Sequence, residues 1–71
     1  DIIPLALQFI EESCQEHHIE IEAVDREFLQ VLQRYRWPGN LRELRNHMRR
    51  AVLFAEDRRL TVRDLSPKLF G

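Results

Sequence analysis

The chain has 71 residues, of which 44% are hydrophobic and 32% charged, and its formal net charge at pH 7 is −1. This length allows one domain with a thin core, so we expect marginal stability in isolation. The negative balance disfavours a general nucleic-acid binder, which would have a basic domain, and no apolar run approaches the roughly 18 residues that span a bilayer. The first residue is Asp1 rather than a methionine, which we interpret as the start of a fragment of a larger protein.

The first predicted element is a helix over residues 2–14. Its apolar residues recur at the spacing of one buried helical stripe, and they are Ile2, Leu5, Ala6, Phe9 and Ile10. Asp1 can cap the first turn, where Pro4 is tolerated because early helical N–H groups have no intrahelical partner. Cys14, the single cysteine, cannot form an intrachain disulfide and is expected to be a small core or edge residue.

Residues 15–24 are predicted to form a loop. The segment 19–22 alternates apolar and acidic residues as a strand does, but we expect no partner for a lone strand of four residues. A second helix is predicted over 26–35, with Asp25 as its N-cap. It must end before Trp37, because the residue that precedes a proline is pushed out of the helical region.

Trp37, Pro38, Gly39 and Asn40 form a predicted turn. Pro38 fixes its own φ, and Gly39 permits φ values that other residues resist. Asn40 is a strong N-cap, and Glu43 three residues later completes a capping-box pattern. We therefore predict a third helix over residues 41–55, with an apolar side made of Leu41, Leu44, Met48, Ala51, Val52 and Ala55.

Thr61 and Asp64 repeat the pattern of a cap followed by an acid, which predicts a short final helix that ends near Pro67. The predicted fold class is therefore all-α: a small bundle of three helices plus a short C-terminal fourth.

Charge is unevenly distributed along the chain. Residues 11–27 are mostly acidic, whereas residues 34–50 contain six arginines and one glutamate. At about 100° per residue, Arg42, Arg45 and Arg49 fall within a ~60° arc of the third helix. Arg42 lies in the first turn, where the helix dipole favours an anion, and its planar guanidinium suits phosphate. The alternative interpretation of these arginines is an ordinary solvated face.

The block from Trp37 to Leu44, with Asn46, Arg50 and Ala51 after it, resembles the sensor II region of sigma-54-dependent transcriptional activators, which belong to the AAA+ ATPase superfamily. Three other segments resemble the same family: residues 1–5, where its lid begins, residues 28–35, which lead into the turn, and residues 60–65, which close the lid. The resemblance therefore covers essentially the whole chain, as a single lid subdomain.

This resemblance implies a lid that packs over ATP, with Mg²⁺, held by a larger α/β subdomain of the same protein. Arg42 corresponds to the sensor II arginine, which reaches the phosphates and couples nucleotide state to lid position. Gly39 and Asn40 would shape the turn beside the nucleotide, and Ile2 and Ile3 would lie near the adenine. Trp37 and Pro38 would anchor the turn, with Trp37 in the core.

The resemblance also implies the partners: neighbouring subunits of a ring, sigma-54 RNA polymerase through another part of the protein, and DNA only through another domain. It implies a cytoplasmic protein without membrane contact. The 71 residues contain no Gly-x-x-x-x-Gly-Lys-Ser/Thr phosphate loop. We therefore expect no catalytic residue in this chain and no tight binding of ATP by it alone, and ATP hydrolysis is expected of the whole protein.

Two other functions remain open at this point. The second and third helices with their four-residue turn imitate a DNA-binding helix-turn-helix, and the bundle could be a protein–protein interaction module without a nucleotide. A metal site is disfavoured, because adjacent His17 and His18 do not by themselves converge on one ion and no further ligand lies at suitable spacing.

Overall fold

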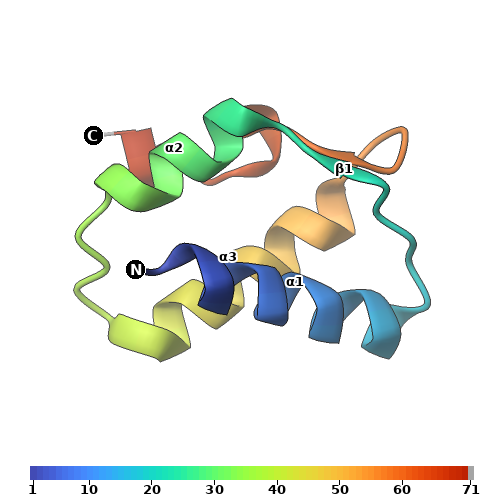
Figure 1. Ribbon diagram of the computed structural model, residues 1–71, viewed down its shortest axis with the longest axis horizontal. Coiled ribbons are helices and arrows are strands. Elements are labelled where there is room, and N and C mark those ends of the chain that lie inside the picture. The colour runs from blue at the N-terminus through green and yellow to red at the C-terminus, as the bar shows by residue number, and fades with distance from the viewer. Residues whose placement is uncertain (71) are drawn as a thin grey trace.

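The computed structural model describes residues 1–70, and within them the chain forms three α-helices: α1 (Ile3–His17), α2 (Arg26–Arg34) and α3 (Asn40–Phe54). Helices α1 and α3 pack along each other, and α2 lies over them with the C-terminal segment beside it (Figure 1). The predicted helical bundle is confirmed. None of the helices within residues 1–70 combines the length and apolarity needed to cross a membrane.

Helix α1 is three residues longer at its C-terminal end than predicted. The side chain of Asp1 accepts the backbone N–H of Ile3 at 3.1 Å, so the predicted cap is present. The helix continues to His17 and stops at His18, whose φ of 56° is left-handed. The N–H of Ile19 then closes the end by donating to the carbonyl of Cys14 at 2.9 Å, a common way for a helix to terminate.

The prediction that residues 15–24 contain no strand was wrong. Strand β1 (Ala23–Val24) pairs in parallel with β2 (Arg59–Leu60). Flanking backbone bonds extend this pairing, since the N–H of Glu22 donates to Arg58 at 2.7 Å and that of Asp25 donates to Leu60 at 2.9 Å. The partner lies more than 30 residues away, and the turn after α3 brings it into position, so no local pattern could indicate it.

Helix α2 begins and helix α3 ends within one residue of the predicted bounds, and Asp25 holds the predicted N-cap position of α2. Asp25 makes no side-chain cap bond. Its carboxylate instead accepts from the guanidinium of Arg59 at 2.8 Å, beside the strand pair. The ion pair between the two connecting segments has therefore replaced the local cap.

The C-terminal segment contains two short 3-10 helices, η1 (Val62–Asp64) and η2 (Pro67–Phe70). The predicted capping box opens η1, because the backbone N–H of Thr61 donates to the Asp64 carboxylate at 2.8 Å. A second turn begins at Pro67, where the prediction placed an end. Proline suits a first helical position because it has no N–H to leave unpaired there.

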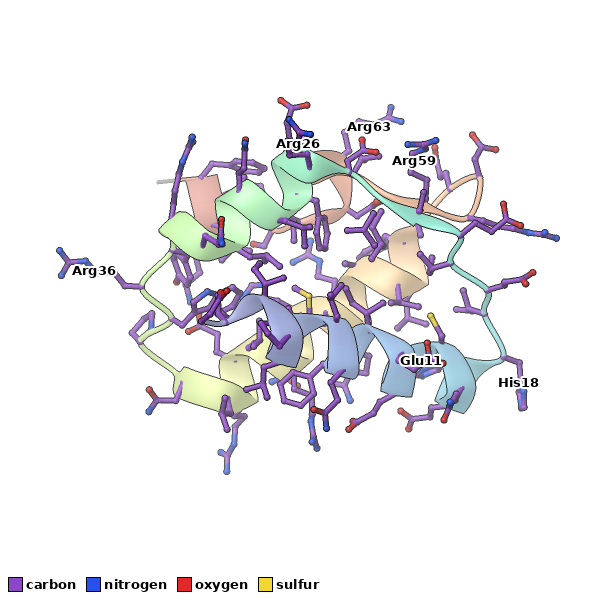
Figure 2. The ribbon with its side chains drawn as sticks, in the orientation of Figure 1. Glu11, His18, Arg26, Arg36, Arg59 and Arg63 are labelled. Atoms are coloured by element: carbon purple, nitrogen blue, oxygen red, sulfur yellow. The ribbon has the colours of Figure 1, made fainter. Side chains whose placement is uncertain are left out.

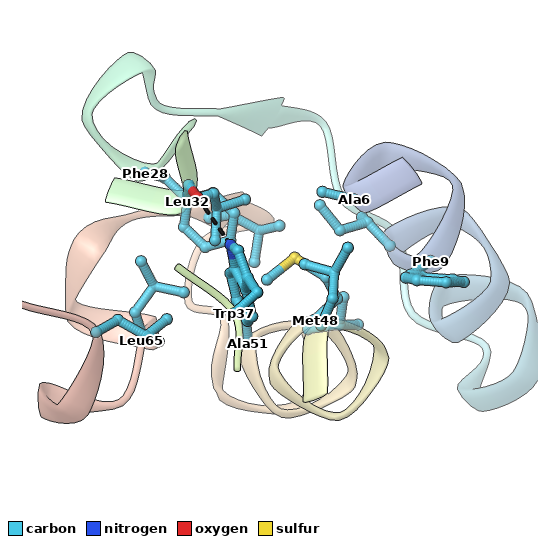
Figure 3. Close-up of a cluster of buried hydrophobic side chains, with 13 residues drawn as sticks. Ala6, Phe9, Phe28, Leu32, Trp37, Met48, Ala51 and Leu65 are labelled. Atoms are coloured by element: carbon cyan, nitrogen blue, oxygen red, sulfur yellow. Dashed lines mark hydrogen bonds between the residues drawn. The ribbon is translucent and has the colours of Figure 1, made fainter. Parts of the chain in front are cut away.

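The core lies between the α1–α3 pair and the α2 layer (Figure 3). Trp37 is 8% exposed, so its predicted place in the core is confirmed. Cys14 is half-buried at the edge, and burial raises the pKa of its thiol, which disfavours a reactive thiolate. The largest fully buried side chains are Phe28, Leu32, Leu44, Met48, Val52 and Leu60.

Truncation of Met48 to alanine is expected to lower the free energy of unfolding by about 2–5 kcal/mol, because it opens a cavity in a fully buried site. The matched control is Leu53→Ala on the same helix, where the side chain is 51% exposed and the change should stay within about 0.5 kcal/mol. Urea unfolding followed by circular dichroism measures both. Equal losses in the two variants would contradict the assigned packing of α3.

Candidate functional site

The turn between α2 and α3 is anchored by Trp37. Its indole N–H donates to the backbone carbonyl of Leu32 at 2.8 Å, the contact drawn in Figure 3. Its ring packs edge-on against Tyr35 and His47, with ring centroids 4.9 and 5.5 Å away. Trp37 has a left-handed φ of 54°, which is unusual for a bulky residue and is held in place by this burial.

Gly39 and Asn40 exchange the roles that the sequence predicts for them. Gly39 has an ordinary φ of −84° with ψ of 7°, which matches the third residue of a type I turn. The left-handed residue is Asn40, with φ of 58°. A Cβ on Gly39 would lie 2.8 Å from the Cβ of Glu43, so the glycine is needed because Glu43 approaches closely, not because of its φ.

The predicted capping box of α3 is also corrected. Gly39 is the N-cap, the side chain of Asn40 makes no cap bond, and the helix starts at Asn40 itself. Glu43 still reaches back to the turn, but its Oε1 accepts the backbone N–H of Gly39, at 2.8 Å. This bond lowers the pKa of the Glu43 carboxyl, with further lowering from Lys68 and Tyr35, so the group is ionised at neutral pH.

Arg42 lies exposed on the first turn of α3 and lines a hollow of about 330 Å³. Gly39, Asn46 and Lys68 contribute to the same hollow. Among residues 1–70, no carboxylate forms an ion pair with Arg42. The guanidinium is therefore available to an anion from outside the domain, beside the positive end of the α3 dipole.

Asn40 and Ile2 line a second hollow of about 480 Å³, together with Trp37 and Leu41. Ile3 packs partly buried against the core and does not line this hollow. Four of the five residues predicted to contact nucleotide therefore line two different hollows, and residues of the turn contribute to both. Arg36, which follows α2, extends away from the body at this end of the domain (Figure 2).

The other two arginines of the predicted arc are engaged within the domain. Arg45 lies over the ring of Phe9 at 4.8 Å and approaches Glu12 at 3.7 Å. Arg49 donates to the side-chain oxygen of Asn46 at 3.2 Å. The interpretation as a solvated face therefore fits Arg45 and Arg49. Arg42 is the member of the arc that lines the 330 Å³ hollow.

The structure disfavours two alternatives. Helix α3 packs mainly on α1, and its approach to α2 is slight, whereas a helix-turn-helix packs its two helices together. The ring of His17 contacts the Ser13 carbonyl at 3.1 Å, while His18 points away from the body (Figure 2). Within residues 1–70, no three His, Cys, Asp or Glu side chains come together as metal ligands.

Comparison with known families decides the classification. Residues 1–71 match the model of the AAA+ ATPase lid domain. The chain belongs to this family. The resemblance to the lid of sigma-54-dependent activators, drawn from the block Trp37–Leu44, is thereby confirmed.

Several bacterial regulators are similar to this lid. The HTH-type transcriptional regulatory protein TyrR of Haemophilus influenzae is 42% identical over 66 residues, which are 93% of this chain and 21% of that protein. The nitrogen fixation protein VnfA of Azotobacter vinelandii is 42% identical over 69 residues, 97% of this chain and 13% of that protein. The DNA-binding transcriptional regulator NtrC of Azospirillum brasilense is 36% identical over 56 residues, which are 78% of this chain and 12% of that protein. The lid thus spans about a fifth or less of these relatives.

Sequence reasoning missed two residues at this site. Lys68 approaches Glu43 at 3.1 Å from η2, and Tyr35 donates its hydroxyl to the same carboxylate at 3.1 Å. Tyr35 is the last residue of the predicted second helix, and its place just before the turn was a usable signal. No local pattern connects Lys68 with a helix that begins 28 residues earlier.

The variant Gly39→Ala is expected to lose about 1–3 kcal/mol of stability through the clash with Glu43. At Asn40, glycine should be tolerated better than alanine. Asn40→Ala should lower the free energy of unfolding by about 1–2 kcal/mol because of the left-handed φ, whereas Asn40→Gly should leave it unchanged. Thermal unfolding of the three variants measures the order. A stabilised Gly39→Ala protein would show that the close approach of Glu43 is wrong.

Stability should fall as the pH drops below about 6.5, the ordinary pKa of histidine. Burial lowers the pKa of His47 in the folded lid, and Lys68 and Arg50 lower it further while Glu43 opposes them. Unfolded chains therefore bind more protons than folded ones over this range, and the free energy of unfolding decreases. Unfolding measured between pH 7 and pH 5 should show a smaller decrease for His47→Gln. Identical pH profiles would rule out His47 as the group responsible.

Proposed function

We propose that this lid senses nucleotide for a sigma-54-dependent AAA+ transcriptional activator, with Arg42 as its sensor II residue. ATP and Mg²⁺ would be held by the larger α/β subdomain of the same protein, and the lid would close over them. Arg42 would reach the phosphates, and the resulting change of lid position would be passed to neighbouring subunits of a ring.

The observation that carries this proposal is the exposure of Arg42 beside the fixed turn. It faces a hollow from the first turn of a 15-residue helix, and it has no ion pair with another side chain of residues 1–70. A planar cation next to free helical N–H groups is suited to phosphate oxygens. Arg45 and Arg49, although on the same helix, already have partners within the lid.

The remaining residues of the proposed site have supporting roles. Gly39 and Asn40 would give the turn its shape beside the nucleotide. Ile2, in the apolar hollow with Asn40, would lie near the adenine, and Ile3 would support Ile2 from the core. The chemistry of hydrolysis belongs to the rest of the parent protein, which would also contact sigma-54 RNA polymerase and DNA in the cytoplasm.

In the full-length parent protein, Arg42→Ala is expected to lower ATP turnover by about 10-fold to 1,000-fold, because a charged donor to the transferring phosphate is lost. Arg45→Ala is the matched control, one turn further along α3 and engaged with Phe9 and Glu12. Its turnover should stay close to wild type. Nucleotide affinity and circular dichroism are measured alongside to exclude unfolding.

If Arg42→Ala left turnover and transcription activation unchanged, the sensor II assignment would be wrong. Salt-sensitive binding of the 71-residue chain to duplex DNA would then favour the DNA-binding alternative. If ATP analogues bound wild-type and Arg42→Ala full-length protein with the same affinity, and the 71-residue chain did not bind DNA, a protein–protein interaction module would be the better description.

A further inference from the structure

We propose that Glu43 is the positioning residue for Arg42, and that Lys68 of the C-terminal turn holds Glu43 in that role. This inference rests on the proposed function of Arg42. It adds a chain of contacts, through Lys68 and Glu43, by which the C-terminal segment of the lid influences the position of Arg42.

The carboxylate of Glu43 joins three separate segments. Its Oε1 accepts the backbone N–H of Gly39 in the turn, at 2.8 Å. Its Oε2 accepts the hydroxyl of Tyr35 at the end of α2 and the ammonium of Lys68 in η2, both at 3.1 Å. Bonds to an ionised acceptor are the stronger kind, and the Glu43 side chain is only 12% exposed, so solvent competes little for them.

The surroundings of Glu43 are shaped for this arrangement. Gly39 lacks the Cβ that would otherwise collide with Glu43. The pairing with Glu43 raises the pKa of Lys68, so the ammonium keeps its charge. His47 approaches Oε2 at 3.7 Å, but burial lowers the pKa of its ring, so at neutral pH it is a neutral neighbour rather than a competing cation.

Arg42 depends on this arrangement for its direction. Within residues 1–70 no ion pair fixes its guanidinium, so the backbone of the first turn of α3 sets where its side chain starts. Glu43 is the next residue on that turn and fixes the turn to α2 and to η2. Gly39 and Lys68 line the same hollow as Arg42. A shift of the turn by about 1 Å is enough to weaken a catalytic contact.

The test uses the full-length parent protein and four forms: wild type, Arg42→Ala, Glu43→Gln and the double variant. Glutamine can still accept the Gly39 N–H but no longer pairs with the ammonium of Lys68. Glu43→Gln is expected to lower kcat for ATP hydrolysis by roughly 10–100-fold. The double variant is expected to be no slower than Arg42→Ala, because Glu43 acts through Arg42.

Lys68→Met, a change at a side chain that is 62% exposed, should lower kcat in the same direction by a smaller factor while the protein stays folded. The control is Arg59→Met, which breaks an ion pair of 2.8 Å with Asp25 at the strand pair. Its turnover should equal that of wild type.

Two results would overturn the proposal. One is wild-type turnover in both Glu43→Gln and Lys68→Met. The other is a double variant whose loss is the product of the two single losses, as expected for independent structural effects. Both leave the sensor II assignment standing as long as Arg42→Ala alone is slow. An active Arg42→Ala protein would instead contradict the proposed function itself.

Discussion

The burial of Trp37 in a left-handed backbone conformation is the constraint on which the α2–α3 turn depends. A bulky side chain at φ of 54° costs on the order of 1–3 kcal/mol. The cost is offset because the indole is almost fully buried, donates to the Leu32 carbonyl, and packs edge-on against two rings. The turn cannot relax to an ordinary φ without withdrawing this ring from the core, so α2 and α3 are held at one fixed point.

This fixed point determines what the arginines of α3 can do. Arg45 and Arg49 lie further along the helix, over the α1 side and beside Asn46, where Phe9, Glu12 and Asn46 engage them. Arg42 lies in the first turn of α3, within three residues of Gly39 and Asn40, and lines the hollow. Arg45 and Arg49 therefore pack on the surface of the lid, whereas the guanidinium of Arg42 remains available to an external anion.

The helices could be predicted from the sequence because their determinants are local. Apolar spacing located α1 and α3, the cap at Asp25 and the stop before Trp37 bounded α2, and the pattern of Thr61 and Asp64 located η1. The β1–β2 pair, the ion pair of Asp25 and the contact between Lys68 and Glu43 join residues that are 25 or more positions apart, so they leave no periodic signal. The special φ predicted for Gly39 was wrong, and its close approach to Glu43 could not be predicted because that approach exists only in the folded turn.

The contacts that sequence could not indicate share one feature: they attach the C-terminal segment to the rest of the lid. Strand β2 pairs with β1 at one end of α2, and η2 reaches Glu43 at the other end, so the segment runs along α2 between two attachments (Figure 1). The attachment at β2 combines backbone bonds with the ion pair of Arg59 and Asp25, whereas at η2 the buried side chain of Leu69 packs in the core and Lys68 pairs with Glu43. Through Lys68 and Glu43, the C-terminal segment therefore contacts the turn that precedes Arg42, although no local pattern in the sequence connects the two.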